Sequence, residues 1–255
     1  LSCGNYNLLM KKKFLETVLD NLKTLGFALI VAVIIRSLFF QPFYIPSSSM
    51  EPTLLIGDRI FVKKYSYGYS KHSFPFSPPF ASRRFFTKKP NYGDLVVFKT
   101  PADNRTDYIK RLIGLPGDTV QFKNGKLLLN SKEILRTKIS NDYTIRCGSR
   151  SPEINAYKET LPNGKEYIVV YNKFGSMQNT NEFKVPTDHF FFLGDNRDCS
   201  KDSRYLSSVG YVTSENLVGQ ATLIFFSNDT LSGSILQFWN WGESLRVKRF
   251  FEILK

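Results

Sequence analysis

The sequence predicts a mostly β protein: an N-terminal transmembrane helix followed by an all-β domain with a β insertion. Runs of alternating or continuous β-branched and aromatic residues recur from residue 59 onward, as is typical of strands. The chain of 255 residues contains 23 Phe and 13 Tyr, a composition that favours β-structure. One long apolar segment lies near the N-terminus, and the sequence beyond it shows no long amphipathic helix.

The apolar segment is expected to be a retained membrane anchor over residues 24–44. Its uninterrupted run, TLGFALIVAVII, is shorter than the roughly 20 residues that cross a hydrocarbon core. Apolar character resumes after Arg36, however, and a long arginine side chain can reach the interface from within a span. The aromatic residues that follow resemble an interfacial belt: Phe39, Phe40, Phe43 and Tyr44.

The orientation of the anchor follows from its flanking charges. Lys11, Lys12 and Lys13 precede the span, and basic residues mark the cytoplasmic side of a membrane. Residues 1–23 are therefore expected in the cytoplasm and the domain on the outer face. The small residues 47–49 leave a cleaved signal peptide open as the alternative.

Five stretches of the domain are expected to contain strands: residues 59–67, 94–100, 118–134, 163–173 and 216–227. Within the third, Asn124-Gly125 is the residue pair that favours a two-residue hairpin turn. The expected organisation is one core in two parts, residues 45–134 and 186–255, separated by a β insertion over residues 135–185.

Two segments stand apart from this core. Residues 68–90 mix Pro, Ser, Phe and basic residues, and they are read either as an ordinary surface loop or as a loop that touches the membrane surface. The tail at 237–255 is aromatic and basic, and it is expected either to pack on the domain or to lie on the membrane.

The charge and the cysteine count limit the classes of function. The net charge of +13 suits an anionic membrane surface or nucleic acid, but the cations are scattered and no nucleic-acid-binding motif is present. No metal site is expected, because the chain has two histidines and neither CxxC nor HExxH. No nucleotide cofactor is expected either, since G-x-G-x-x-G and P-loop patterns are missing. A Cys147–Cys199 disulfide and free thiols both remain open.

A lysine is the more promising base for hydrolysis than either histidine. His72 lies in the Pro- and Phe-rich loop, and His189 precedes a strand-like run, so both are read as incidental. Lys110 lies within DYIKRLIGLPGD, among apolar and aromatic neighbours. Burial there would lower the pKa of the amine and allow it to deprotonate a serine, although a lysine in a strand is more often exposed.

Four motifs together resemble the bacterial type I signal peptidases, also called leader peptidases. They occur in the family's order after an anchor: PSSSMEPTL (46–54), YGDLVVFK (92–99), YIKRLIGLPGD (108–118) and FLGDNRDCSKDSRY (192–205). The stretch GYVTSENLVGQA (210–221) is also similar. The resemblance covers residues 25 to 225 approximately, and it is weak in the loop and the insertion.

The resemblance implies a serine endopeptidase without a cofactor. Ser49 corresponds to the nucleophile and Lys110 to the general base. The backbone N–H of Ser49 and the hydroxyl of Ser47 correspond to the oxyanion site, and Ser200 to a hydroxyl that orients the lysine amine. Structural support by ion pairing is implied for a charged group: Asp195, Arg197, Asp202, Arg204 and Arg111.

The resemblance also implies shallow substrate pockets that accept small residues at positions −1 and −3 of a signal peptide, the A-x-A pattern. The positions that match the −1 pocket are Ile45, Met50, Leu54, Tyr108 and Ile109. Those that match the −3 pocket are Phe43, Ile60 and Val97. Ordinary core packing is the alternative role for each of these residues.

The expected function is therefore removal of signal peptides from exported preproteins by an enzyme of the bacterial inner membrane. Its expected partners are signal peptides and the phospholipid membrane, with no metal and no nucleic acid. Two alternatives remain. One is a self-cleaving repressor-type protease, which would need a DNA-binding domain. The other is a membrane-tethered binding protein, inactive or differently targeted, with the same fold.

Overall fold

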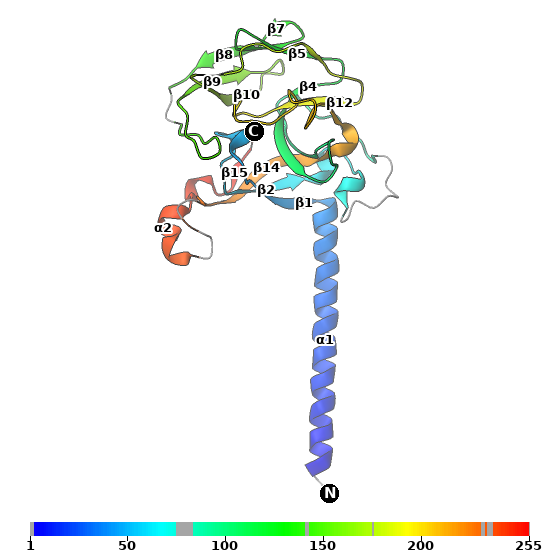
Figure 1. Cartoon of the computed structure of the whole chain (residues 1–255). Coiled ribbons are helices and arrows are strands. Elements are labelled where there is room, and N and C mark those ends of the chain that lie inside the picture. The colour runs from blue at the N-terminus through cyan, green and yellow to red at the C-terminus, as the bar shows by residue number, and fades with distance from the viewer. Residues whose placement is uncertain are drawn as a thin grey trace.

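The computed structural model describes residues 3–74, 84–140, 143–174, 176–230, 233 and 237–254, with side chains from Met10 onward. Helix α1 (Cys3–Leu38) projects away from the β domain as a single straight rod (Figure 1). Its part Met10–Leu38 is long and apolar enough to cross a membrane. Its large apolar side chains, such as Phe27 and Ile30, are exposed.

The helix ends earlier than the predicted anchor, which extends to residue 44. Residues Phe40–Tyr44 instead form strand β1, which pairs antiparallel with β2 (Asp58–Lys63). Pro42 is a poor residue for a helix interior but is tolerated in an edge strand, and β1 is at the edge of its sheet. Side chains alternate along β1, so Phe43 packs on the core while Tyr44 is exposed.

The main sheet has eight strands, and all except β1 come from residues 45–134 and 186–255. Its order is β1-β2-β14-β3-β4-β12-β13, with β15 paired to β14. The strands not yet given are β3 (Leu95–Lys99), β4 (Asp107–Gly114), β12 (His189–Leu193), β13 (Val212–Thr213), β14 (Leu217–Ser227) and β15 (Glu252–Ile253). The mostly β fold predicted from the sequence is confirmed.

Two smaller sheets cover the side of the domain that lies away from α1 (Figure 1). One has the order β11-β5-β6-β7, with β5 (Thr119–Lys123), β6 (Lys126–Leu129), β7 (Lys132–Glu133) and β11 (Phe183–Lys184). The other has the order β10-β9-β8, with β8 (Leu135–Lys138), β9 (Ile154–Thr160) and β10 (Glu166–Asn172). Residues 135–185 thus supply β8 to β11.

The turn between β5 and β6 has the conformation that its sequence predicts. Asn124 has φ 51° and Gly125 has φ 70°, both in the left-handed region that a type I′ hairpin requires. The turn fixes the register, with Lys123 opposite Lys126. The buried residues Phe122 and Leu127 consequently face the core of this half of the domain.

Short helices complete the described part of the chain. They are the 3₁₀ turns Ser48–Met50, Lys64–Ser66, Lys71–Ser73, Ser214–Asn216, Phe238–Asn240 and Val247–Arg249, and helix α2 (Trp241–Ser244). The tail packs on the domain through β15, although Trp239 and Phe251 remain exposed. Residues 75–83 of the loop at 68–90 lie outside the described residues, so contact of this loop with a membrane stays a prediction.

Candidate active site

The serine turn follows directly on the edge strand β1. Ser49 lies in the 3₁₀ turn Ser48–Met50 and is 7% exposed. The backbone N–H of Asn196 donates to the Ser49 carbonyl at 3.2 Å, and its side-chain amide donates to the Ser48 carbonyl at 3.1 Å. Asn196 itself is fully buried, so these two hydrogen bonds connect the turn to the loop after β12 within the protein interior.

Strand β4 brings Lys110 to this turn. The Lys110 amine nitrogen lies 2.5 Å from Ser49 Oγ, and the two residues are 61 positions apart in the sequence. The amine also donates to the Ile109 carbonyl at 3.0 Å and lies 5.5 Å from the centre of the Tyr108 ring. At 2% exposure, Lys110 is a buried amine with few polar partners.

The surroundings of Lys110 favour its neutral form. Burial lowers the pKa of its amine to about 8, because a charged group loses hydration in an apolar setting. The carboxylates of Asp202 and Asp195 act in the opposite direction, and the guanidinium of Arg204 adds to the lowering. A substantial fraction of the amine is therefore unprotonated near pH 8, as a general base must be.

Two further serines lie beside this pair. Ser47 Oγ is 3.3 Å from Ser49 Oγ, at the exposed edge of the turn. Ser200 is buried, and the described part of the chain contains no hydrogen bond between its hydroxyl and Lys110. A Cβ at Gly194 would lie 2.2 Å from Ser200 Oγ and 2.5 Å from the Ser49 carbonyl oxygen, so only glycine allows this close approach.

Buried ion pairs hold the loop that follows β12. Arg111 makes a two-point contact with Asp195, at 2.8 and 2.7 Å, and Thr53 donates to the same carboxylate at 2.5 Å. Arg204 pairs with Asp202 at 2.8 Å. Burial by itself raises the pKa of Asp202, but the pairing with Arg204 outweighs it and the pKa is lowered.

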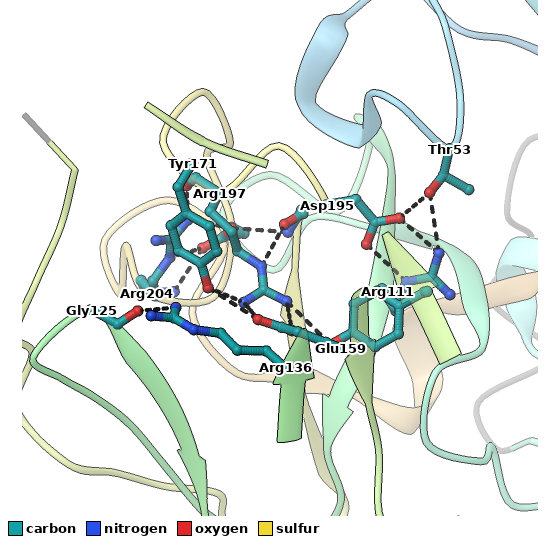
Figure 2. A network of polar contacts seen from close by, with 12 residues as sticks. Thr53, Arg111, Gly125, Arg136, Glu159, Tyr171, Asp195, Arg197 and Arg204 are labelled. Atoms are coloured by element: carbon teal, nitrogen blue, oxygen red, sulfur yellow. Dashed lines mark hydrogen bonds and ion pairs between the residues drawn. The ribbon is translucent and has the colours of Figure 1, made fainter. Parts of the chain in front are cut away.

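A second buried pair joins this loop to the insertion. Arg197 contacts Glu159 of β9 at 2.7 and 3.2 Å, and both side chains are at most 1% exposed. The hydroxyl groups of Tyr167 and Tyr171 donate to the same carboxylate. Figure 2 shows Arg111–Asp195 and Arg197–Glu159 as parts of one network that also includes Arg204. These ion pairs connect the loop to β4 and to the insertion, and the supporting role expected for the residues stays a prediction.

An open groove of about 400 Å³ leads to the Ser49–Lys110 pair. Six of the predicted pocket residues line it: Phe43, Ile45, Ile60, Val97, Tyr108 and Ile109. The other two, Met50 and Leu54, are fully buried in the core behind it and do not reach its surface. The groove is also lined by Tyr44, which was expected in the interfacial belt, and by three residues that the sequence analysis did not single out: Thr106, Asp107 and Lys201.

A disulfide closes one side of the groove. Cys147 and Cys199 are bonded, with 5.4 Å between their Cα atoms, and Cys199 lines the groove next to Ser200. The bridge ties the segment after β8 to the loop that holds Ser200 and Asp202. Neither histidine takes part, since His72 lies in another cavity and His189 contacts the Thr187 carbonyl.

The sequence analysis also missed two contacts of the serine turn. Asn196 lies within a motif that it quoted, but no local pattern indicates that the amide reaches residues 48 and 49. Arg249, in the tail, pairs with Asp58 at 2.7 Å and donates to the Thr53 carbonyl at 2.9 Å. The tail therefore braces the segment between Ser49 and β2.

A serine hydroxyl in contact with a buried low-pKa amine, at the end of an open groove, is the arrangement of a serine protease, which is a hydrolase. Comparison with known proteins then gives the family. Residues 18–226 match the family described as signal peptidase, peptidase S26, and the chain belongs to this family.

Curated relatives agree with this assignment. Signal peptidase I of Rickettsia akari (strain Hartford) is 42% identical over 250 residues, which cover 90% of each chain. Signal peptidase I of Rickettsia typhi (strain ATCC VR-144 / Wilmington) is 40% identical over 257 residues, covering 94% of this chain and 95% of the relative. A crystal structure of a signal peptidase I from Enterococcus faecalis V583 is 28% identical with a TM-score of 0.31, and covers 52% of this chain and 97% of that one. The family expected from the four motifs is confirmed.

Proposed function

We propose that this protein is a membrane-bound endopeptidase that cleaves signal peptides from exported preproteins, with Ser49 as nucleophile and Lys110 as general base. The observation that carries the proposal is the 2.5 Å contact between the Lys110 amine and Ser49 Oγ. Membership of the signal peptidase family supports the reaction class.

The proposed reaction begins with transfer of the Ser49 hydroxyl proton to the neutral Lys110 amine. Ser49 Oγ attacks the scissile carbonyl carbon and forms a tetrahedral oxyanion. Lys110 then returns the proton to the leaving amine, which becomes the N-terminus of the mature protein. A water molecule, deprotonated by Lys110, hydrolyses the acyl-enzyme and restores Ser49.

The oxyanion is proposed to accept hydrogen bonds from the Ser49 backbone N–H and the Ser47 hydroxyl. One such donor is worth roughly 10²–10³ in rate. Ser200 is proposed to orient the Lys110 amine as its protonation changes, a role that its buried position on Gly194 supports. Asp195 and Asp202, held by Arg111 and Arg204, keep this loop in place.

The groove supports selection of small residues at positions −1 and −3 of the signal peptide. Its lining includes the bulky side chains of Ile109 and Tyr108, which precede Lys110 on β4, and we propose that they keep the groove shallow beside Ser49. In an extended substrate these two positions point to the same side, while position −2 points away.

Replacing alanine by phenylalanine at −1 of a model preprotein should lower kcat/KM about 10- to 100-fold. A side chain that is too large for its pocket costs about 1–3 kcal/mol. The same replacement at −2 is the matched control and should change kcat/KM less than about threefold. Equal losses at the two positions would contradict selection by this groove.

Membrane attachment is proposed through α1, with the N-terminus in the cytoplasm and the catalytic domain on the outer, periplasmic face of the inner membrane. The lysines before the span support this orientation. The Cys147–Cys199 disulfide supports it independently, because disulfides persist in oxidising compartments and are rare in the cytosol.

The rate of cleavage should rise with pH between 7 and 9. The folded-state pKa of Lys110 is about 8, below its ordinary value, so the active neutral amine increases from about a tenth of the molecules at pH 7 to about nine tenths at pH 9. We expect a roughly tenfold rise in kcat/KM over this interval, measured on a model preprotein of constant charge. A flat or falling profile would exclude Lys110 as the base.

The test of the proposed function is cleavage of a purified preprotein with an A-x-A site by the detergent-solubilised full-length protein. A product of mature length is expected, and mass spectrometry of its N-terminus identifies the cleaved bond. Failure to cleave, with folding confirmed, would favour a membrane-tethered protein with another target.

A further inference from the structure

A second cavity, of about 710 Å³, lies where α1 enters the domain, and no step of the proposed reaction uses it. Positively charged side chains dominate its lining: Arg36, Lys64, Lys71, Lys99 and Arg105. Among the described residues of the lining, two carboxylates face them, Asp103 and Asp107. The five cations against two anions leave an excess of three positive charges in one cavity.

The two carboxylates are already engaged. Asp107 pairs with Lys99 at 2.9 Å. Asp103 accepts hydrogen bonds from Thr100, Thr106 and the backbone N–H of Arg105. Within the described residues, the side chains of Arg36, Lys71 and Arg105 form no ion pair, so their charges are uncompensated.

Lys64 adds a buried cation at the inner end of the cavity. It is 3% exposed, and its amine donates to the Ser73 carbonyl at 2.6 Å. Burial and then the nearby Arg36 charge lower the pKa of its amine to about 8. An ammonium has three donors, and the described residues accept from only one of them. The buried Ser37 hydroxyl, which also lines the cavity, has no partner among the described residues. Both groups are therefore free to bind an anion.

The position of the cavity indicates where the anion comes from. Arg36 lies in the last turn of α1, at the end of the segment that can span a membrane. Figure 1 shows α1 leaving the domain at this point, beside β1. If α1 crosses the membrane as proposed, the cavity lies at the level of the lipid headgroups. It also shares Phe43 and Asp107 with the substrate groove, so its occupant would be next to the emerging signal peptide.

We infer that this cavity binds the phosphate of an anionic phospholipid headgroup and so fixes the domain against the membrane surface. The inference rests on the proposed membrane anchoring and not on the cleavage chemistry. Its recognition elements are the uncompensated cations of Arg36, Lys71 and Arg105 together with the buried donors of Lys64 and Ser37. Such cations attract anionic lipids near a membrane surface.

The test is lipid binding by the full-length protein in detergent, followed by its thermal unfolding. Short-chain phosphatidylglycerol is the probe, and phosphatidylcholine of the same chain length and inorganic phosphate are the comparisons. A ligand that binds only the folded state raises Tm, and the rise grows with the logarithm of one plus the ratio of its concentration to Kd. Phosphatidylglycerol should raise Tm at concentrations at least about tenfold lower than either comparison.

In the double variant K71Q/R105Q, the concentration of phosphatidylglycerol needed for the same rise in Tm should be about tenfold higher or more. The matched control is K123Q/K132Q, which removes the same charge from exposed lysines of β5 and β7 at the far end of the domain (Figure 1). This control should bind as the unaltered protein does.

Three outcomes would overturn the inference. If both double variants weakened the stabilisation by phosphatidylglycerol equally, the net charge of the protein alone would attract the lipid. Equal effects of phosphatidylglycerol and inorganic phosphate would mean an anion site without lipid preference. Stabilisation by an acidic peptide but not by the lipid would assign the cavity to preproteins. The experiment measures lipid binding and not cleavage. Its result would therefore still test the lipid site if the protein failed to cleave signal peptides.

Discussion

Ser49→Ala and Lys110→Met should each lower the rate of signal-peptide cleavage by at least about 10⁴-fold without unfolding the domain. The two groups act as a unit on the same proton, so loss of either one removes the nucleophile in its active form. The double variant should be no slower than the slower single variant. Mature product is quantified over long incubations of a purified preprotein in detergent.

The chain supplies matched controls for both changes. Ser48 is as buried as Ser49 and lies in the same turn, so Ser48→Ala should retain cleavage within about tenfold. Lys165 is another lysine whose pKa is lowered by burial, but its amine lies 3.7 Å from Asp94 and does not contact Ser49. Lys165→Met should therefore retain cleavage. Turnover by Ser49→Ala or Lys110→Met at the rate of these controls would refute the assignment.

Loss of Lys110 should not destabilise the protein. Because the folded-state pKa of its amine is about 8, below the unfolded value, the unfolded chain binds more protons and stability rises with pH between those two values. At pH 7 the buried amine therefore opposes folding, and methionine removes this cost. The Tm of Lys110→Met at pH 7 should equal or exceed that of the unaltered protein, which separates lost chemistry from lost folding.

Arg197→Leu should have the largest effect on stability among the charged residues near the site. It leaves the carboxylate of Glu159 buried without its cation, and breaking such a pair costs about 3–5 kcal/mol. For a domain of this size that corresponds to a fall in Tm of about 10 °C. Thermal unfolding of the detergent-solubilised full-length protein measures it.

The double variant R197L/E159L tests whether the cost comes from the unpaired charge. It should recover more than half of the lost Tm, because no isolated charge remains. Lys158–Glu166 is the matched control, an exposed ion pair whose lysine is next to Glu159 on β9 and whose glutamate is on β10, with 44% and 51% side-chain exposure. Lys158→Ala should change Tm by less than about 2 °C. A similar small change for Arg197→Leu would mean that the buried pair does not hold the loop.

Local pattern was sufficient to predict some of the strands, namely β2, β3, β5, β6, β7, β10 and β14, but not the end of the anchor. Period-2 alternation and the Asn124-Gly125 turn depend on residues that are neighbours in the chain, so both can be recognised from a single sequence. Residues 40–44 are apolar and aromatic whether they lie in a membrane or form a half-buried edge strand, and composition alone does not separate the two. Pro42 was the available signal, because it fits an edge strand better than a helix.

Prediction from the sequence was more limited for the active site than for the strands. A lysine in a strand is usually exposed, and only the match of four motifs to a known family identified Lys110 as a partner of Ser49. Glu159 was not predicted, because its cation is 38 positions away and the sequence around it alternates like any strand with an exposed face. Its burial results from the docking of the insertion on the loop after β12, which is a tertiary contact without a local signature.

The direct passage from helix α1 into strand β1 has a consequence for substrate choice. Between Leu38 and Ser49 the chain is one edge strand and one short turn, and Asn196 and Arg249 hold the segment that follows. If α1 is fixed in the bilayer, Ser49 stands at a constant height above it. The protein would then select signal peptides by the number of residues between their apolar part and their cleavage site, because only a segment of the matching length reaches Ser49.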